Sequence, residues 1–183
     1  CEIRNGAYDQ WRDALAKAAG TTRERVLVSS LHQHDAPVTD AGAEALLKSV
    51  GLAGELYDEE FHDDAIERVA AALKDSLEVA ARVTHLGTGQ AKVEGVASNR
   101  RIVHENGAVS FGRGSRSGSD EFLANAPDGL IDPMLKTISF WNGDKPIAAL
   151  HSYATHPMSY YGRGEVTSDF VGLARERRQR DDQ

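Results

Sequence analysis

The stretch from Arg25 to Pro37, RVLVSSLHQHDAP, decides the expected fold, because an apolar run leads directly into two histidines. Residues Arg25–Ser30 have the aliphatic and β-branched composition of a buried strand. Strand side chains alternate between faces, so His32 and His34 would point the same way from the carboxyl end of that strand. Open α/β sheets keep their sites at this end. The stretch therefore predicts a strand with a polar site directly after it.

A second polar cluster, Thr155–Ser159, follows the apolar run Ile147–Leu150 and contains His156. Two strand ends that each supply an imidazole predict a metal site assembled from distant segments. Neutral imidazole is the commonest metal ligand in proteins, and Zn²⁺ is its usual partner. Asp35 is a candidate ligand, or a carboxylate that orients an imidazole. The alternative interpretation is that these histidines only occupy polar loops that cap strands.

The composition narrows the class of partner. The chain has 183 residues, of which 40% are hydrophobic and 27% charged, enough for one domain with a sizeable core. A formal net charge of −7 argues against a nucleic-acid groove, which needs a basic face, and leaves a small-molecule or lipid-derived substrate. No apolar run approaches the ~20 residues of a membrane span. The single cysteine, Cys1, excludes an internal disulfide.

Both ends of the chain look cut. It begins with Cys1 rather than Met, no signal peptide is visible, and it stops within a polar, helix-like stretch at Gln183. We therefore expect these residues to belong to a longer polypeptide.

Hydrophobic periodicity predicts helices interspersed with strands. Helical patterns cover Tyr8–Ala18 (ended by Gly20), Ala41–Val50 (ended by Gly51), Asp58–Arg82, and a segment N-capped by Ser168. Strand patterns cover Arg25–Ser30, Val83–Ser98, Leu135–Trp141 and Ile147–Tyr153, with the last two as an antiparallel hairpin. Asn106-Gly107 predicts a two-residue turn between Arg101–His104 and Ala108–Phe111. This order predicts an α/β or α+β single domain, with a mixed β-sheet flanked by helices.

Other polar residues have both a functional and a structural interpretation. Arg100 is a candidate for holding a substrate oxygen through charge-assisted hydrogen bonds, although adjacent arginines at a turn are usually solvated. Asp169, after Ser168, is most simply an acidic residue in the first turn of a helix. Four histidines have no partner pattern, and we expect them to be structural: His62, His85, His104 and His151.

Several segments taken together resemble the neutral/alkaline (non-lysosomal) ceramidases. Leu27–Pro37 resembles the first metal motif of that family, which runs roughly Thr-His-Thr-His-Ser-Gly-Pro. Ala97–Arg101 resembles its Asn-Arg-Ser/Arg segment, and Asp132–Phe140 the strand region before the second metal motif. His156–Ser159 resembles its His-Pro-x-Ser segment, and Ser168–Gly172 the stretch that follows. The resemblance runs in order from about residue 8 to about residue 176.

This resemblance implies that residues 1–183 are the N-terminal part of a ceramidase-like catalytic domain, a zinc-dependent hydrolase of an amide bond in an N-acyl, ceramide-like substrate. It maps His32 and His156 to zinc ligands, and His34 and Arg100 to contacts with the substrate or the oxyanion. The remaining zinc ligands of the family, a glutamate and a tyrosine, lie further along than Gln183. We therefore expect residues 1–183 alone to be inactive. Family members are often exported.

The sequence also departs from the family pattern. Gln33, Asp35 and Ala36 replace small and hydroxyl residues, so the substrate could be another N-acyl compound or not a lipid at all. One alternative is a three-histidine centre of His32, His34 and His156, bridged by Asp35 or Asp169, that hydrolyses esters, phosphoesters or lactones. Another alternative is a non-catalytic binding or structural domain.

Overall fold

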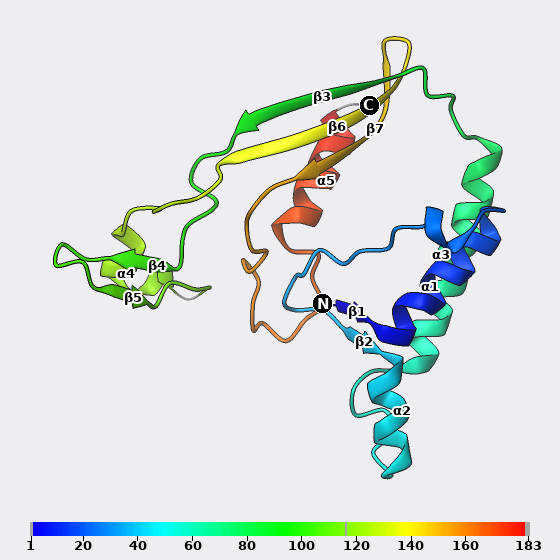
Figure 1. Ribbon diagram of the computed structural model, residues 1–183, viewed down its shortest axis with the longest axis horizontal. Helices are drawn as coiled ribbons and strands as arrows, with labels where there is room; N and C mark the ends of the chain where they lie inside the picture. Colours follow the sequence, from blue (N-terminus) through cyan, green and yellow to red (C-terminus); the bar gives the residue numbers. More distant parts are fainter. Residues whose placement is uncertain (1, 116, 182–183) are drawn as a thin grey trace. The chain divides into compact units, whose positions relative to one another are not determined.

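The protein is described by a computed structural model of residues 2–115 and 117–181 (Figure 1), and Cys1 lies outside this description. Contacts within the chain form two compact units, residues 1–80 with 162–183 and residues 81–161. Helices and strands occur in both units, which confirms the predicted α/β class. The parallel and antiparallel strand pairs lie in separate sheets of two or three strands, whereas the sequence predicted one mixed sheet.

The first unit is mainly helical. A short parallel pair joins β1 (Glu2–Arg4) to β2 (Val38–Asp40), with Glu2 opposite Val38. The helices are α1 (Asn5–Ala18), α2 (Ala41–Ser49), α3 (Glu59–Glu78) and α5 (Asp169–Asp181), and a 3₁₀ turn covers Arg23–Arg25. The carboxylates of Asp40 and Asp58 accept the backbone N–H groups of Ala43 and Phe61, so aspartates cap both α2 and α3.

The core of this unit lies around α1 and α3. Ala7, Ala16 and Ile66 are buried there. His62 is only 3% exposed and meets the rings of Trp11 and Tyr57 edge-on. Burial of an imidazole between two aromatic rings confirms the predicted structural role of His62.

The second unit is mainly β-structure. Its larger sheet has the antiparallel order β3-β6-β7, formed by β3 (His85–Lys92), β6 (Met134–Asn142) and β7 (Lys145–Ser152). A hairpin of β4 (Arg101–Val103) and β5 (Val109–Phe111), the 3₁₀ turn Ser117–Ser119 and the short helix α4 (Glu121–Asn125) complete the unit. Both predicted hairpins are confirmed, β4–β5 and β6–β7.

The predicted strand Arg25–Ser30 is wrong. Residues 26–33 have no regular secondary structure, and Leu27 is 85% exposed. An aliphatic and β-branched run expresses a local preference, but a strand persists only beside a hydrogen-bonded neighbour. Within residues 2–115 and 117–181 no strand pairs with this segment. The predicted strand Val83–Ser98 is likewise shorter, because pairing with β6 stops at Lys92.

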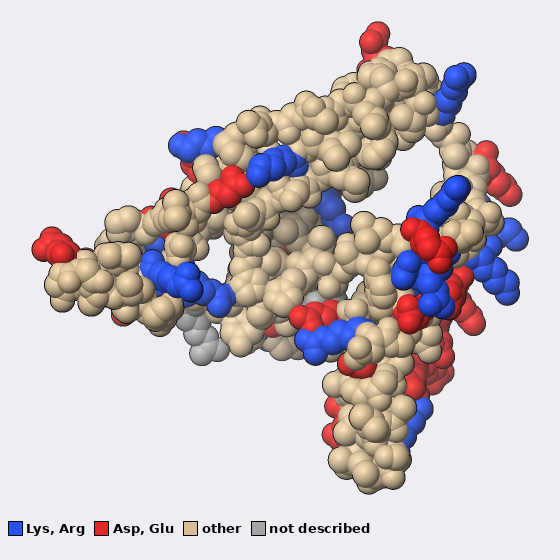
Figure 2. Space-filling model, viewed as in Figure 1, with Lys and Arg blue, Asp and Glu red and all other residues tan. Residues whose placement is uncertain are grey.

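Charged side chains of both signs are interspersed on the face shown in Figure 2. Ion pairs in the described ranges include Arg23 with Asp13 and Lys48 with Glu59. None of the helices in the described ranges combines the length and the apolar character needed to cross a membrane.

Candidate metal centre

His32 and His34 come together in the irregular segment that follows the first 3₁₀ turn. Their ring centroids are 5.2 Å apart, with the ring planes nearly perpendicular at 88°. Because this segment is not a strand, side-chain alternation does not bring them together. The backbone of His32 instead adopts a left-handed φ of 54°. Residues other than glycine rarely adopt this left-handed backbone conformation. Those that do are often found at functional sites, where the surrounding structure holds them in place.

A carboxylate that sequence reasoning missed lies beside His32. Glu2, on β1, places its Oε1 atom 3.4 Å from Nδ1 of His32. Its other oxygen, Oε2, forms an ion pair with Arg4 on the same strand. A carboxylate at one ring nitrogen favours the tautomer that leaves the other nitrogen free to bind a metal. No local pattern identifies Glu2, because only the folded chain brings residue 2 to residue 32.

Asp35 has a different role from the one predicted. Its carboxylate accepts the backbone N–H groups of Gly162 at 2.7 Å and Arg163 at 2.6 Å, and its carbonyl oxygen accepts that of Thr167 at 2.8 Å. The hydrogen bond from Arg163 is the largest cause that lowers the pKa of Asp35 below its ordinary value. Asp35 therefore anchors the loop before α5 and is not a member of the metal-capable group.

Asp169, the other proposed bridging carboxylate, is also outside that group. It is 1% exposed, has a left-handed φ of 55°, and its Oδ1 atom accepts the backbone N–H of Phe170 at 2.6 Å. Asp169 thus lies at the first turn of α5, as predicted, with its carboxylate turned to the helix backbone. The structure does not support a bridging role for Asp35 or Asp169.

Arg100 lies against the predicted ligand His156. Its Nη2 atom is 2.5 Å from Nδ1 of His156 and 2.8 Å from the sulfur of Met158. The neighbouring Asn99 holds this segment, because its backbone N–H and side-chain amide donate to the carbonyls of Asp128 and Leu130. Arg100 is therefore fixed beside an imidazole, rather than being a purely solvated arginine at a turn.

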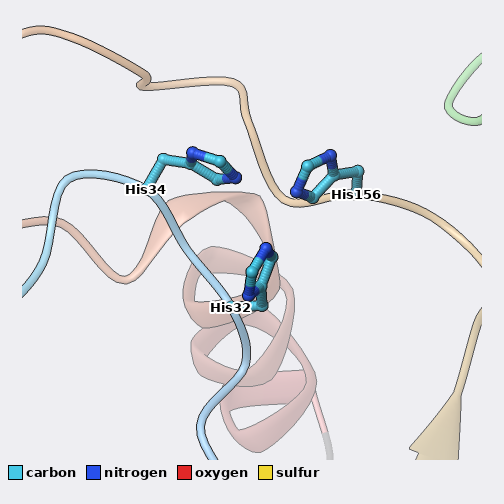
Figure 3. Close-up of side chains that lie close together, drawn as sticks. All are labelled: His32, His34 and His156. Atoms are coloured by element: carbon cyan, nitrogen blue, oxygen red, sulfur yellow. The ribbon is translucent and has the colours of Figure 1, made fainter. Parts of the chain in front are cut away.

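His32, His34 and His156 form the one group in the described ranges that could hold a metal ion (Figure 3). Each offers one ring nitrogen; His32 and His34 belong to the first unit and His156 to the second. The close-up labels the three side chains. Three imidazoles with room for a further ligand are a donor set found in catalytic zinc sites. The group contains both predicted ligands, His32 and His156, together with His34.

The remaining histidines have structural partners. His85 stacks on Trp141, His104 contacts the hydroxyl of Ser110 at 3.0 Å, and His151 contacts that of Thr137 at 2.8 Å. With His62, all four lie outside the metal-capable group, as the sequence predicted.

No protein-family model matches the chain, and no curated protein or solved structure is significantly similar to it.

Proposed function

We propose that His32, His34 and His156 hold a divalent metal ion and that the protein is a metal-dependent hydrolase. The observation that carries this proposal is the candidate group of three histidines, in which the rings of His32 and His34 lie 5.2 Å apart, centroid to centroid. Imidazole suits zinc, copper, iron and nickel, and zinc is the metal that hydrolases use most widely with this donor set. The amide bond of an N-acyl, ceramide-like compound is the substrate we propose, on the basis of the sequence motifs.

The residues beside the three histidines would have separate roles in the proposed reaction. A zinc ion bound there would act as a Lewis acid toward a carbonyl oxygen. Arg100 carries N–H donors and a fixed positive charge next to His156. Such a group can stabilise negative charge that develops on the carbonyl oxygen of an amide during attack. Glu2 lies beside His32, and its other carboxylate oxygen pairs with Arg4.

His34 has two competing assignments. The motif resemblance implies a contact with the substrate, whereas the ring of His34 lies 5.2 Å from that of the proposed ligand His32, centroid to centroid, which favours a ligand. We propose that His34 is the third ligand, because it belongs to the same candidate group.

Metal stoichiometry tests the site. The purified protein is stripped with a chelator, reloaded with Zn²⁺, and its zinc is measured by elemental analysis. We expect one zinc per chain in the wild type, and its loss in His32→Ala, His34→Ala and His156→Ala. His151→Ala is a matched control, because His151 contacts Thr137 and lies outside the group. Stoichiometric zinc in His32→Ala or His156→Ala would refute the ligand assignment. Zinc retained only in His34→Ala would show that His34 is not a ligand and would favour its role as a substrate contact.

An all-imidazole donor set also favours a second candidate, a three-histidine hydrolase of esters or phosphoesters. The group contains no carboxylate within the described part of the chain, so this centre would lack the bridging aspartate that the sequence predicted. Turnover of matched N-acyl amide, ester and phosphoester substrates by the zinc-loaded full-length protein distinguishes the two. Preference for the amide supports the first candidate, and cleavage of the esters or phosphoesters alone supports the second.

A further inference from the structure

We propose that Glu2 is a positioning residue that holds the ring of His32 in the orientation and tautomer needed to bind a metal ion. This inference rests on the proposed function, because it concerns the same metal centre. It adds a residue for which the motifs give no indication.

The two oxygens of the Glu2 carboxylate have different partners. Oε1 lies 3.4 Å from Nδ1 of His32, and Oε2 forms an ion pair with Arg4. Arg4 therefore fixes one edge of the carboxylate, so that the other edge faces the imidazole. The Glu2 side chain is 30% exposed, against 52% for His32, so the contact is partly shielded from water.

Strand pairing fixes the backbone that carries Glu2. Residues Glu2–Arg4 pair in parallel with Val38–Asp40, and the hydroxyl of Thr39 donates to the carbonyl oxygen of Glu2 at 3.5 Å. Glu2 is thus presented to His32 from a paired strand rather than from a free chain end. Because β2 follows the histidine segment closely, the same pairing ties both partners to one small sheet.

The chemistry of a ligating histidine explains why this contact matters. An imidazole binds a metal through one nitrogen and carries its hydrogen on the other, and a carboxylate beside that second nitrogen fixes the tautomer and increases ligand basicity. Nδ1 of His32 faces Glu2, which leaves Nε2 for the metal.

Zinc affinity provides the first test. Dissociation constants are measured by competition with a chromophoric chelator for the wild type, Glu2→Gln and Glu2→Ala, and for Glu67→Ala as a control that removes an exposed glutamate on α3. We expect Glu2→Ala to weaken zinc binding about 10–100-fold, the usual effect of losing a partner of a metal-ligating histidine. The zinc dissociation constant of Glu2→Gln should lie between those of the wild type and Glu2→Ala, because its amide oxygen can still accept the Nδ1–H group. Glu67→Ala should match the wild type.

The tautomer of His32 provides a second readout that general loosening of β1 would not change in the same way. In ¹⁵N-labelled, metal-free protein we expect the Nδ1–H tautomer in the wild type and Glu2→Gln, and a mixture in Glu2→Ala. If the wild type binds no zinc, the proposed function fails. If the wild type binds zinc and Glu2→Ala binds it as tightly as Glu67→Ala, or keeps the wild-type tautomer, only the positioning role of Glu2 is overturned.

Discussion

Replacing Arg100 with alanine should tighten metal binding and slow catalysis at the same time. A neutral imidazole has one N–H donor and one acceptor nitrogen. With Nη2 of Arg100 2.5 Å from Nδ1, that nitrogen of His156 accepts, and Nε2 carries the hydrogen. A metal at Nδ1 must displace the guanidinium, and a metal at Nε2 must move the hydrogen to Nδ1, where it would face the guanidinium hydrogens. In either case Arg100 and the metal compete for His156.

The magnitude follows from this contact. A hydrogen bond from a charged donor contributes about 1.5–3 kcal/mol, and the exposed position of this one places it at the lower end. Since 1.4 kcal/mol corresponds to about a tenfold change in an equilibrium constant, the zinc dissociation constant of Arg100→Ala should fall about tenfold. Binding of the metal releases the guanidinium toward the substrate, so loss of this donor should lower kcat by about 10²–10³.

The assay is chelator competition for zinc, paired with turnover of an N-acyl amide by the zinc-loaded full-length protein. Arg101→Ala is the matched control, because it removes the same charge one residue away, from a side chain that lies over the ring of Phe111. We expect Arg101→Ala to resemble the wild type in both measurements. Weaker zinc binding by Arg100→Ala, or equal binding by the two variants, would refute the competition between Arg100 and the metal.

Three further predictions concern the fold around the site. Ile66→Ala, at a position 8% exposed, should lower the free energy of unfolding by about 2–5 kcal/mol in urea, and a loss near zero would contradict its core position. Gly172→Ala would place a Cβ 1.9 Å from Oγ and 2.3 Å from Cβ of Ser168, so a strain of about 1–3 kcal/mol should outweigh the gain in helix propensity of about 1 kcal/mol. The melting temperature of Gly172→Ala should be lower than that of the wild type, and adding Ser168→Gly should restore it. A Gly172→Ala protein more stable than the wild type would refute this. The backbone N–H of Arg163 lowers the pKa of Asp35, so the carboxylate stabilises the fold above the unfolded-state value of about 3.9, and that stability is lost as pH falls through the lower folded pKa. Asp35→Asn should therefore have a lower urea midpoint than the wild type at pH 7 and approach it in acid, whereas a difference independent of pH would count against this account.

Local signals predicted the helices and hairpins well, because their causes lie within a few residues. The Asn106-Gly107 turn forms with Gly107 at a φ of 80°, and Asn106 accepts the backbone N–H of Ala108. Asp58 caps α3 where the acidic first turn indicated its start. These interactions need no distant partner, so the sequence alone contains the information.

The segment Arg25–Ser30 shows where such signals fail. Its composition is that of a strand, yet strand formation depends on a neighbour elsewhere in the chain, and here residues 26–33 remain irregular. The sequence predicted that strand alternation would bring His32 and His34 together. In the structure their rings meet in an irregular segment in which His32 has a left-handed backbone.

The sequence by itself determined the chemistry that the chain can offer: imidazoles at positions 32, 34 and 156, an arginine at 100, and a formal net charge of −7. Tertiary structure decided which groups lie side by side within each unit. It set the ring of His34 beside that of His32, turned Asp35 to a loop backbone, and put Glu2 beside His32. The physical reason is the distance along the chain over which each property acts. Residue type and turn propensity are local properties, whereas the environment of a candidate ligand depends on contacts between residues remote in the chain.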